Sequence, residues 1–288
     1  MSDAPRTLYS INGRIVPEEK AVVPVTDRGF LYGDGVFETL HAYGHTLFRQ
    51  QEHLQRLRRG AEALYFKPLP SLNDLARQLK RLVDAADFAE ANVRLTVTRG
   101  TGPRGPSISG TYSPNVIITA TEFHRPPEER LRAGARAIFA SFRRQESAAT
   151  AKLKTLNYIE QILARREADE AGADEALLLN NAGLLCEGSA SNISLVSGGV
   201  LRIPDPDRSG ALPGIAQLTA IEAARNLNIP VVMTALSPWD PAEADEAFLS
   251  GSMREITPLV RIGDAVIGSG KPGPVTLALI AEYRRIVE

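Results

Sequence analysis

Residues 153–158 read Leu-Lys-Thr-Leu-Asn-Tyr, where a strand-like run is expected to end and a helix to begin. Only six of the 33 basic residues are lysines, yet two of them, Lys152 and Lys154, lie in an otherwise uncharged segment. An amine, unlike a guanidinium, loses its proton at modest cost and can form a Schiff base with a carbonyl group. The alternative is a solvent-facing lysine at a strand end, so other parts of the sequence have to decide between the two interpretations.

The composition is that of an ordinary globular protein. A chain of 288 residues exceeds what one hydrophobic core usually holds, so we expect two domains. With 43% hydrophobic residues, 23% charged residues and a net charge of -1, nothing indicates a nucleic acid or a membrane as partner. One cysteine, Cys186, and four scattered histidines leave no metal-ligand cluster of recognisable spacing. No apolar run of signal length or of 18 residues occurs, which favours a cytoplasmic location.

Residues 1–122 predict a small α/β domain. An Asn-Gly pair at 12–13, flanked by alternating apolar residues, indicates a β-hairpin over residues 8–16. Three glycines between positions 29 and 35 permit positive φ angles and a close approach of other groups, as at a turn or in the wall of a site. Apolar periodicity predicts helices over 51–64 and 71–86, the second with Ser71 as its N-cap, and strands over 36–42, 93–98 and 115–120.

Residues 123–134, with two adjacent prolines, predict an interdomain linker, and residues 135–288 predict a larger, β-rich domain. We expect strands over 135–140, 175–179, 184–186, 192–196, 200–203, 231–233, 247–249 and 259–262, and helices over 156–171, 214–227 and 273–287. Hairpin-length connections outnumber crossover-length ones, so the fold class is α+β with much antiparallel sheet.

Three stretches of the second domain suit a phosphorylated cofactor that has a ring nitrogen. Residues 211–216, Ala-Leu-Pro-Gly-Ile-Ala, open a helix whose first amides can bind phosphate, although proline is also ordinary at a helix start. Residues 250–253, Ser-Gly-Ser-Met, offer hydroxyls and backbone amides to an anion. Residues 186–192 place Glu187 among small residues that let a flat ring approach, and a carboxylate beside a pyridine nitrogen keeps that nitrogen protonated.

With these motifs in this order, the chain resembles the fold-type IV enzymes that depend on pyridoxal 5'-phosphate (PLP). That family comprises branched-chain aminotransferases, D-amino acid aminotransferases and aminodeoxychorismate lyases. The resemblance extends from the Asn-Gly pair at 12–13 through 154–158, 187–189, 212–215 and 255–258 to Gly-Lys-Pro-Gly at 270–273. It implies a two-domain fold, PLP as cofactor, an amino acid and a 2-oxo acid as substrates, and a homodimer.

The resemblance also implies roles for single residues. Lys154 corresponds to the Schiff-base lysine, Glu187 to the partner of the pyridine nitrogen, and Tyr158 faces the phenolic oxygen of the cofactor. Arg56, the amides of Ile215 and Ala216, and Ser252 are expected at the phosphate. The other expected cofactor contacts are Ser191, Asn192, Leu212, Gly214 and Gly251, and the expected substrate contacts are Phe37, Arg104, Met253 and Arg254. Lys152 is then a structural residue.

The substrate class depends on a loop rich in glycine and proline. Residues 99–105 resemble a segment of D-amino acid aminotransferases in which an arginine, here Arg104, grips the substrate carboxylate from the neighbouring subunit. Those enzymes have a histidine where this chain has Pro106, and such a loop is more commonly an exposed turn. Residues 37–39, Phe-Glu-Thr, lack the Phe-Glu-Gly-x-Arg pattern of branched-chain enzymes. Arg254 either holds an acid group or forms a surface ion pair.

We therefore expect an amino acid transaminase with a ping-pong mechanism, and D-amino acids are slightly favoured as donors. The alternatives are a branched-chain L-amino acid transaminase, an aminodeoxychorismate lyase, and a binding protein without activity on a degenerate enzyme fold.

Overall fold

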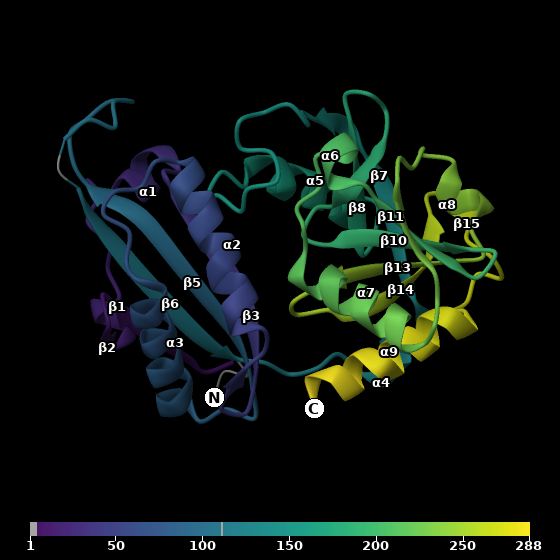
Figure 1. Ribbon diagram of the computed structural model, residues 1–288, viewed down its shortest axis with the longest axis horizontal. Helices are drawn as coiled ribbons and strands as arrows, with labels where there is room; N and C mark the ends of the chain where they lie inside the picture. Colours follow the sequence, from purple (N-terminus) through teal and green to yellow (C-terminus); the bar gives the residue numbers. More distant parts are fainter. Residues whose placement is uncertain (1–4, 111) are drawn as a thin grey trace. The chain divides into compact units, whose positions relative to one another are not determined.

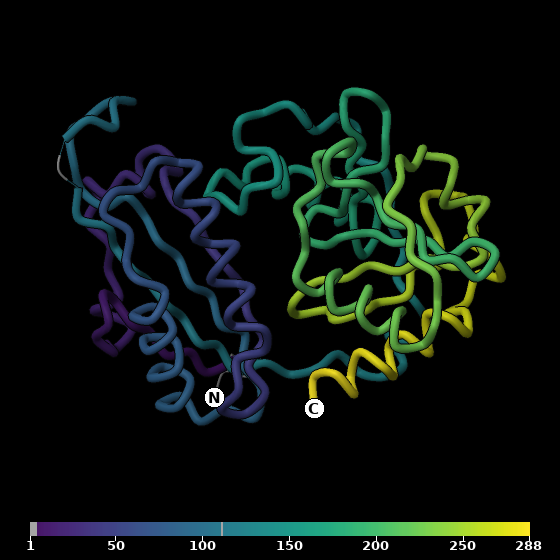
Figure 2. Tube along the Cα trace, in the orientation of Figure 1, coloured from purple at the N-terminus to yellow at the C-terminus, as the bar shows by residue number. Residues whose placement is uncertain are grey.

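The computed structural model describes residues 5–110 and 112–288 and divides the chain into two compact units (Figure 1). Unit 1 contains Met1–Arg125 and Leu153–Asn157, and unit 2 contains Pro126–Lys152 and Tyr158–Glu288. The chain therefore passes from one unit to the other three times, and its course can be followed in Figure 2. The first passage falls within the predicted linker. The sequence predicted only one boundary between the domains, so the return of Leu153–Asn157 to unit 1 was not predicted.

Unit 1 is an antiparallel sheet of six strands with two long helices. The strands are β1 (Thr7–Ile11), β2 (Arg14–Val16), β3 (Gly35–Tyr43), β4 (Thr46–Leu47), β5 (Glu90–Thr101) and β6 (Ser113–Glu122), in the order β2-β1-β6-β5-β3-β4. The helices are η1 (Glu18–Lys20), α1 (Arg28–Tyr32), α2 (Gln50–Ala63) and α3 (Leu72–Ala86).

Local sequence explains these elements. Asn12 and Gly13 both have positive φ angles, 50° and 77°, as the predicted β1–β2 hairpin turn requires. The Ser71 hydroxyl accepts the amide of Asp74 and caps α3, as the sequence predicted. The apolar sides of α2 and α3 share one buried core with the sheet (Figure 1). Members of this core include Leu54, Leu57, Leu75 and Leu79 from the helices and Leu40, Val93, Leu95 and Ile118 from the strands.

Unit 2 contains a mixed sheet of nine strands. These are β7 (Ala135–Arg144), β8 (Glu175–Asn180), β9 (Leu185–Gly188), β10 (Asn192–Ser197), β11 (Val200–Pro204), β12 (Val231–Thr234), β13 (Glu246–Gly251), β14 (Glu255–Ile262) and β15 (Ala265–Val266). The order is β12-β11-β10-β13-β14-β7-β8-β9, and β15 pairs with β14. The helices are α4 (Glu128–Ala133), α5 (Ile159–Glu170), α6 (Pro206–Ser209), α7 (Ile215–Asn226), α8 (Asp240–Glu243) and α9 (Pro274–Val287).

The sheet of unit 2 has the predicted antiparallel pairs, and β7 runs parallel to both β8 and β14. Helix α5 makes the crossover from β7 to β8 and packs on both strands, while α7 and α9 pack together against β13 and β14 (Figure 1). Helix α5 begins at Ile159, three residues later than predicted, because residues up to 157 belong to unit 1. No helix among the described residues is long and apolar enough to span a bilayer.

Candidate active site

The segment that carries Lys154 extends the sheet of unit 1 at the start of β3. The carbonyl of Lys154 accepts the amide of Phe37, and the amide of Leu156 donates to the carbonyl of Gly35, both at 3.0 Å. Val36 and Thr155 form the antiparallel bridge between these bonds. This pairing fixes the backbone on both sides of the lysine and leaves its side chain half-buried.

Two glycines allow this close approach. A Cβ atom at Gly35 would lie 2.5 Å from Leu156 Cδ1, and one at Gly33 would lie 2.5 Å from Asn157 Oδ1. Gly33 also has a φ of 66°, which only glycine adopts without strain in most contexts. The glycine-rich stretch is therefore the surface on which the lysine segment packs, which is one of the uses that the sequence suggested.

Phe37 lies directly under the lysine. Phe37 is 3% exposed, and Lys154 Nζ and Arg94 Cζ lie 4.6 Å and 3.8 Å from its ring centroid. A cation over an aromatic face is attracted by the ring quadrupole, so Phe37 helps to define where the amine stands. Contact between Phe37 and a substrate stays a prediction.

Arg56 is held by a buried carboxylate that the sequence analysis missed. Glu38, next to Phe37 on β3, is wholly buried and accepts hydrogen bonds from Arg56 Nε at 2.8 Å and Nη2 at 2.6 Å. His53 Nδ1 lies 2.7 Å from the same carboxylate. His53 and Arg56 are three residues apart on α2, so one helix face presents both to β3. The sequence feature that could have revealed this ion pair is an acidic residue, Glu38, within a mostly apolar strand.

Charges in this cluster are strongly coupled. Burial by itself would raise the pKa of Glu38, but the charge and hydrogen bonds of Arg56, with the bond to His53, lower the pKa to about 2. Burial lowers the pKa of His53, as do the charges of Arg56 and Lys154, and Glu38 offsets this only in part. The ionised carboxylate can only accept, so Nδ1 is the atom of His53 that carries the proton.

In unit 2, Glu187 lies at the end of β9 and is 7% exposed. One carboxylate oxygen accepts the amide of Leu212 at 2.9 Å, and the other forms an ion pair with Arg144 at the end of β7. The carboxylate is therefore fixed from two sides. Arg144 did not stand out in the sequence, because nothing marks which of the neighbouring arginines, 143 or 144, faces inward.

The predicted phosphate site lies at the start of α7. Helix α7 begins after Gly214 without a side-chain cap, which leaves the first amides of the helix available to an anion. A Cβ atom on Gly214 would lie 1.9 Å from Asn192 Oδ1, so this position requires glycine. Asn192 pairs with Ser250 across β10 and β13 and donates to the carbonyl of Leu212 at 2.8 Å. The buried hydroxyl of Ser250 has no hydrogen-bond partner among the described residues.

Arg254 is tied to a second buried carboxylate. Its Nη2 atom lies 3.3 Å from Glu175, which is wholly buried. Glu175 also accepts the amide of Ser189 at 3.1 Å and the hydroxyl of Ser191 at 2.8 Å, and the Ser189 hydroxyl bonds to it as well. The sequence left two uses open for Arg254, binding of an acid group or a surface ion pair. The structure shows an ion pair, but its partner Glu175 is an interior carboxylate. Ser191 likewise directs its hydroxyl to Glu175.

A hollow of about 640 Å³ in unit 2 is bordered by Tyr158, Arg254, Ser189 and one side of α5. Glu187 and the start of α7 do not line it. Met253, Gly251 and Ser252 are half-buried in the turn after β13, which is closed by a bond from the Arg254 amide to the Gly251 carbonyl at 3.0 Å. Unit 1 thus brings together Lys154, Phe37 and the anchored Arg56, and unit 2 brings together Glu187, Asn192, Leu212, Gly214 and the 250–252 turn.

Comparison with known proteins identifies the family of this chain. The model of the family "Amino-transferase class IV" matches residues 35–262. The D-alanine aminotransferase of Listeria monocytogenes is 34% identical over 271 residues, 93% of this chain and 92% of the relative.

Two solved structures match over nearly the whole chain. The branched-chain amino acid aminotransferase of Escherichia coli has a TM-score of 0.90 at 31% identity, covering 95% of this chain and 92% of that one. The 4-amino-4-deoxychorismate lyase of Pseudomonas aeruginosa has a TM-score of 0.85 at 33% identity, covering 96% and 98%.

The fold and the site define a fold-type IV enzyme that uses PLP. The chain belongs to the class IV aminotransferases. Its own residues fit the cofactor, because an uncapped helix start, a buried hydroxyl without a partner and a position without a Cβ atom suit a phosphate. The fixed carboxylate of Glu187 suits a ring nitrogen.

Lys154 and Lys152 can be distinguished by chemical labelling. Reduction of the purified holoenzyme with borohydride is expected to fix the cofactor on Lys154, which mass spectrometry of the peptides would locate. Lys154→Ala should lose the label and turnover. Lys152→Ala should keep both, because Lys152 forms only a partly exposed ion pair with Asp207 at 2.8 Å. A label on Lys152 would contradict the assignment.

Glu38→Gln is expected to destabilise unit 1 by about 3–5 kcal/mol at pH 7, because it leaves the buried charge of Arg56 without its partner. The pKa of Glu38 falls from 4.5 to about 2 in the folded state, so the stabilisation is complete above pH 4.5 and is lost as the pH falls towards 2. Denaturant unfolding at several pH values should show the gap between wild type and variant narrowing over that range. Glu122→Gln is the control, since Glu122 pairs with Arg6 at the surface and should change stability little. Equal effects of the two variants at pH 7 would rule out the buried pair as the cause.

Proposed function

We propose that this aminotransferase moves the amino group of an amino acid to a 2-oxo acid, with D-amino acids slightly favoured as donors. The single observation that supports this preference is the state of Arg104. It is exposed, and its side chain makes no hydrogen bond or ion pair within the described part of the chain. A guanidinium in this state is available to bind a carboxylate bidentately.

The residues of the chain have distinct parts in this proposal. Lys154 would hold the cofactor through a bond from Nζ to its carbonyl carbon. Once the substrate's amino group has displaced Nζ, the freed amine would take the proton from the α-carbon of the amino acid. Bound PLP supplies covalent attachment for the amino group and an electron sink. Glu187, held by Arg144 and the Leu212 amide, would keep the ring nitrogen protonated. Tyr158 would face the phenolic oxygen.

The phosphate would be bound by the amides of Ile215 and Ala216, by Ser252 and by Arg56. A bidentate bond to Glu38 keeps the Arg56 guanidinium in one orientation, so little side-chain entropy is lost on binding an anion. The proposal includes the ping-pong order, the homodimer and the cytoplasmic location expected from the sequence.

The donor is tested by mixing the holoenzyme separately with D-alanine, D-glutamate, L-leucine and (R)-1-phenylethylamine and recording the cofactor's absorption spectrum. We expect a D-amino acid to convert the spectrum fastest, because the loop that presents Arg104 resembles the carboxylate-binding segment of D-amino acid aminotransferases. Faster conversion by L-leucine would favour a branched-chain enzyme. Release of pyruvate from aminodeoxychorismate, without conversion by any amino acid, would favour the lyase.

Arg104→Leu is expected to lower kcat/KM for amino acids by about one to two orders of magnitude, since one charge-assisted pair contributes roughly 1.5–3 kcal/mol. Turnover of an amine without a carboxylate should change little, and steady-state kinetics with both donors measures the difference. Wild-type kinetics of the variant with amino acids would show that the carboxylate is bound elsewhere.

A further inference from the structure

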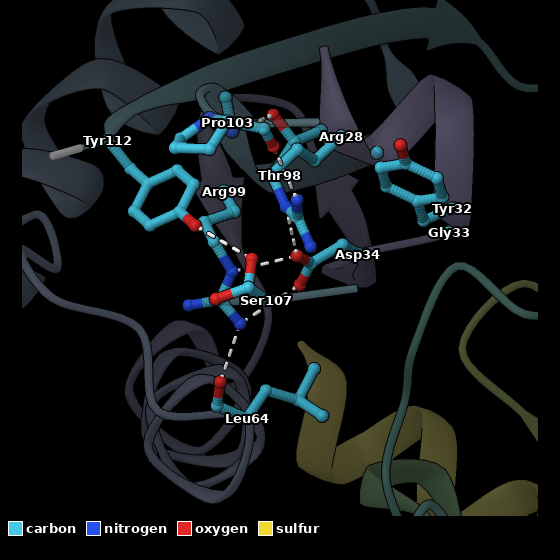
Figure 3. Close-up of polar contacts among 12 residues, drawn as sticks. Arg28, Tyr32, Gly33, Asp34, Leu64, Thr98, Arg99, Pro103, Ser107 and Tyr112 are labelled. Atoms are coloured by element: carbon cyan, nitrogen blue, oxygen red, sulfur yellow. Dashed lines mark hydrogen bonds and ion pairs between the residues drawn. The ribbon is translucent and has the colours of Figure 1, made fainter. Parts of the chain in front are cut away.

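An ion cluster of two buried arginines and a partly buried carboxylate lies in unit 1 beside the loop that carries Arg104. The carboxylate of Asp34 accepts hydrogen bonds from Arg28 Nε at 2.8 Å and from Arg99 Nε and Nη2 at 2.7 and 3.0 Å (Figure 3). Arg28 is 3% exposed and Arg99 is 4% exposed. Burial alone would raise the pKa of Asp34, but the hydrogen bonds and charges of Arg99 and Arg28 lower it, so the carboxylate stays ionised.

Two guanidinium groups share one carboxylate, so their remaining N–H groups need other acceptors. Arg28 Nη1 donates to the carbonyl oxygens of Pro103 at 3.0 Å and Gly105 at 2.8 Å. These two residues stand immediately before and after Arg104. The amide of Gly105 donates in turn to Tyr32 Oη at 2.9 Å, and the Tyr32 ring lies 4.9 Å from Arg28 Cζ. The backbone at Arg104 is thus held on both sides.

Arg99 has a different set of acceptors. It donates to the carbonyl of Leu64 at 2.6 Å, just after the end of α2 (Figure 3). It also donates to the carbonyl of Tyr65 at 3.1 Å, and its Cζ atom lies 4.3 Å from the ring centroid of Phe66. Both arginines are buried and bind Asp34, but among the described contacts Arg28 holds the loop backbone by hydrogen bonds while Arg99 holds the helix end. Arg99 is therefore a matched control for Arg28.

The loop needs such an anchor because it lies outside the strand ladder. Thr101 and Ser113 are the last paired residues of β5 and β6 at this end. Within the loop, Tyr112 Oη donates to the carbonyl of Ser107 at 3.0 Å, and a Cβ atom at Gly102 would lie 2.2 Å from the Tyr112 ring. These contacts fold the loop on itself, whereas Arg28 ties it to α1 and the interior.

We propose that Arg28 is a positioning residue for recognition of the substrate carboxylate. Its bonds to Pro103 and Gly105 hold the backbone on either side of Arg104, so that the Arg104 guanidinium is presented in one place to amino acid and 2-oxo acid substrates. This inference rests on the proposed role of Arg104. Asp34 fixes Arg28 in turn, and no direct contact between Arg28 and the substrate is involved.

Arg28→Lys keeps the charge but removes the forked donors that reach both Asp34 and the two loop carbonyls. We expect KM for the amino acid that reacts best in the donor series to rise roughly tenfold, since a misplaced binding group weakens substrate positioning. Turnover of (R)-1-phenylethylamine and spectral conversion by it should be unchanged. Arg28→Lys added to Arg104→Leu should raise KM no further, because the two residues act through one contact.

A second measurement does not depend on activity. The bond after Arg104 is a trypsin site in an exposed segment, and cleavage there follows local opening of the loop. Mass spectrometry of the holoenzyme during limited digestion should show faster cleavage after Arg104 in Arg28→Lys than in wild type. Arg99→Lys should leave both KM and this cleavage rate near wild type at a temperature where all variants are folded.

The outcomes separate this inference from the proposed function. If Arg104→Leu leaves amino acid kinetics unchanged, the role of Arg104 fails, while the cleavage rates still report whether Arg28 holds the loop. Equal effects of Arg28→Lys and Arg99→Lys on KM and cleavage would overturn the inference, because both would then act through general stability. Unchanged KM and cleavage in Arg28→Lys would overturn it as well.

Discussion

The antiparallel pairing of residues 153–157 with the start of β3 determines where the lysine of this enzyme stands in unit 1. Two amide–carbonyl bonds of 3.0 Å, one on each side of the Val36–Thr155 bridge, hold the segment. The pairing needs Gly33 and Gly35, because a side chain at either position would collide with the segment. Because residues 153–157 are paired with β3, α5 begins only at Ile159. One local contact thus keeps this segment in unit 1 between two stretches of chain that belong to unit 2.

Both units use the same electrostatic device. A carboxylate on or beside a strand is buried, or partly buried at Asp34, and an arginine pairs with it. The pairs are Glu38 with Arg56, Asp34 with Arg28 and Arg99, Glu175 with Arg254, and Glu187 with Arg144. Desolvation makes such pairs weak contributors to net stability, but removing one partner costs about 3–5 kcal/mol. Their effect is therefore to fix orientation. An arginine fixed in this way offers its remaining donors in defined directions, to a backbone carbonyl or to an anion.

The sequence predicted most elements of the fold because their signals are local. The Asn-Gly turn, the Ser71 cap and the apolar periodicities of α2 and α3 depend on neighbouring residues, and the structure confirms each. The order of several motifs along the chain was sufficient to predict the family. Helix α1, by contrast, has only five residues, one of them Gly29, and no apolar period to detect.

The pairing of the buried carboxylates with their arginines could not be predicted in the same way. Glu38 and Arg56 are 18 residues apart, and Arg144 and Glu187 are 43 apart, so only the folded chain brings each pair together. The motif at 270–273 also has a structural use, which its sequence did not reveal. Glu246 accepts the amides of Val275 and Thr276 at 2.9 and 2.6 Å, and a Cβ atom at Gly273 would collide with it.

The arginines considered for the substrate carboxylate differ in what they would lose by binding it. Arg254 already neutralises the interior carboxylate of Glu175, so a substrate carboxylate at its remaining donors would be repelled by that nearby negative charge, or would have to replace the bond to Glu175. Leaving Glu175 unpaired in the interior would cost several kcal/mol, more than one charge-assisted hydrogen bond to a substrate returns. Arg104 has no such partner among the described residues, and its backbone is already held by Arg28. Binding at Arg104 would therefore break no buried ion pair and would order only its side chain, because its backbone is already held. This combination favours Arg104 as the carboxylate ligand.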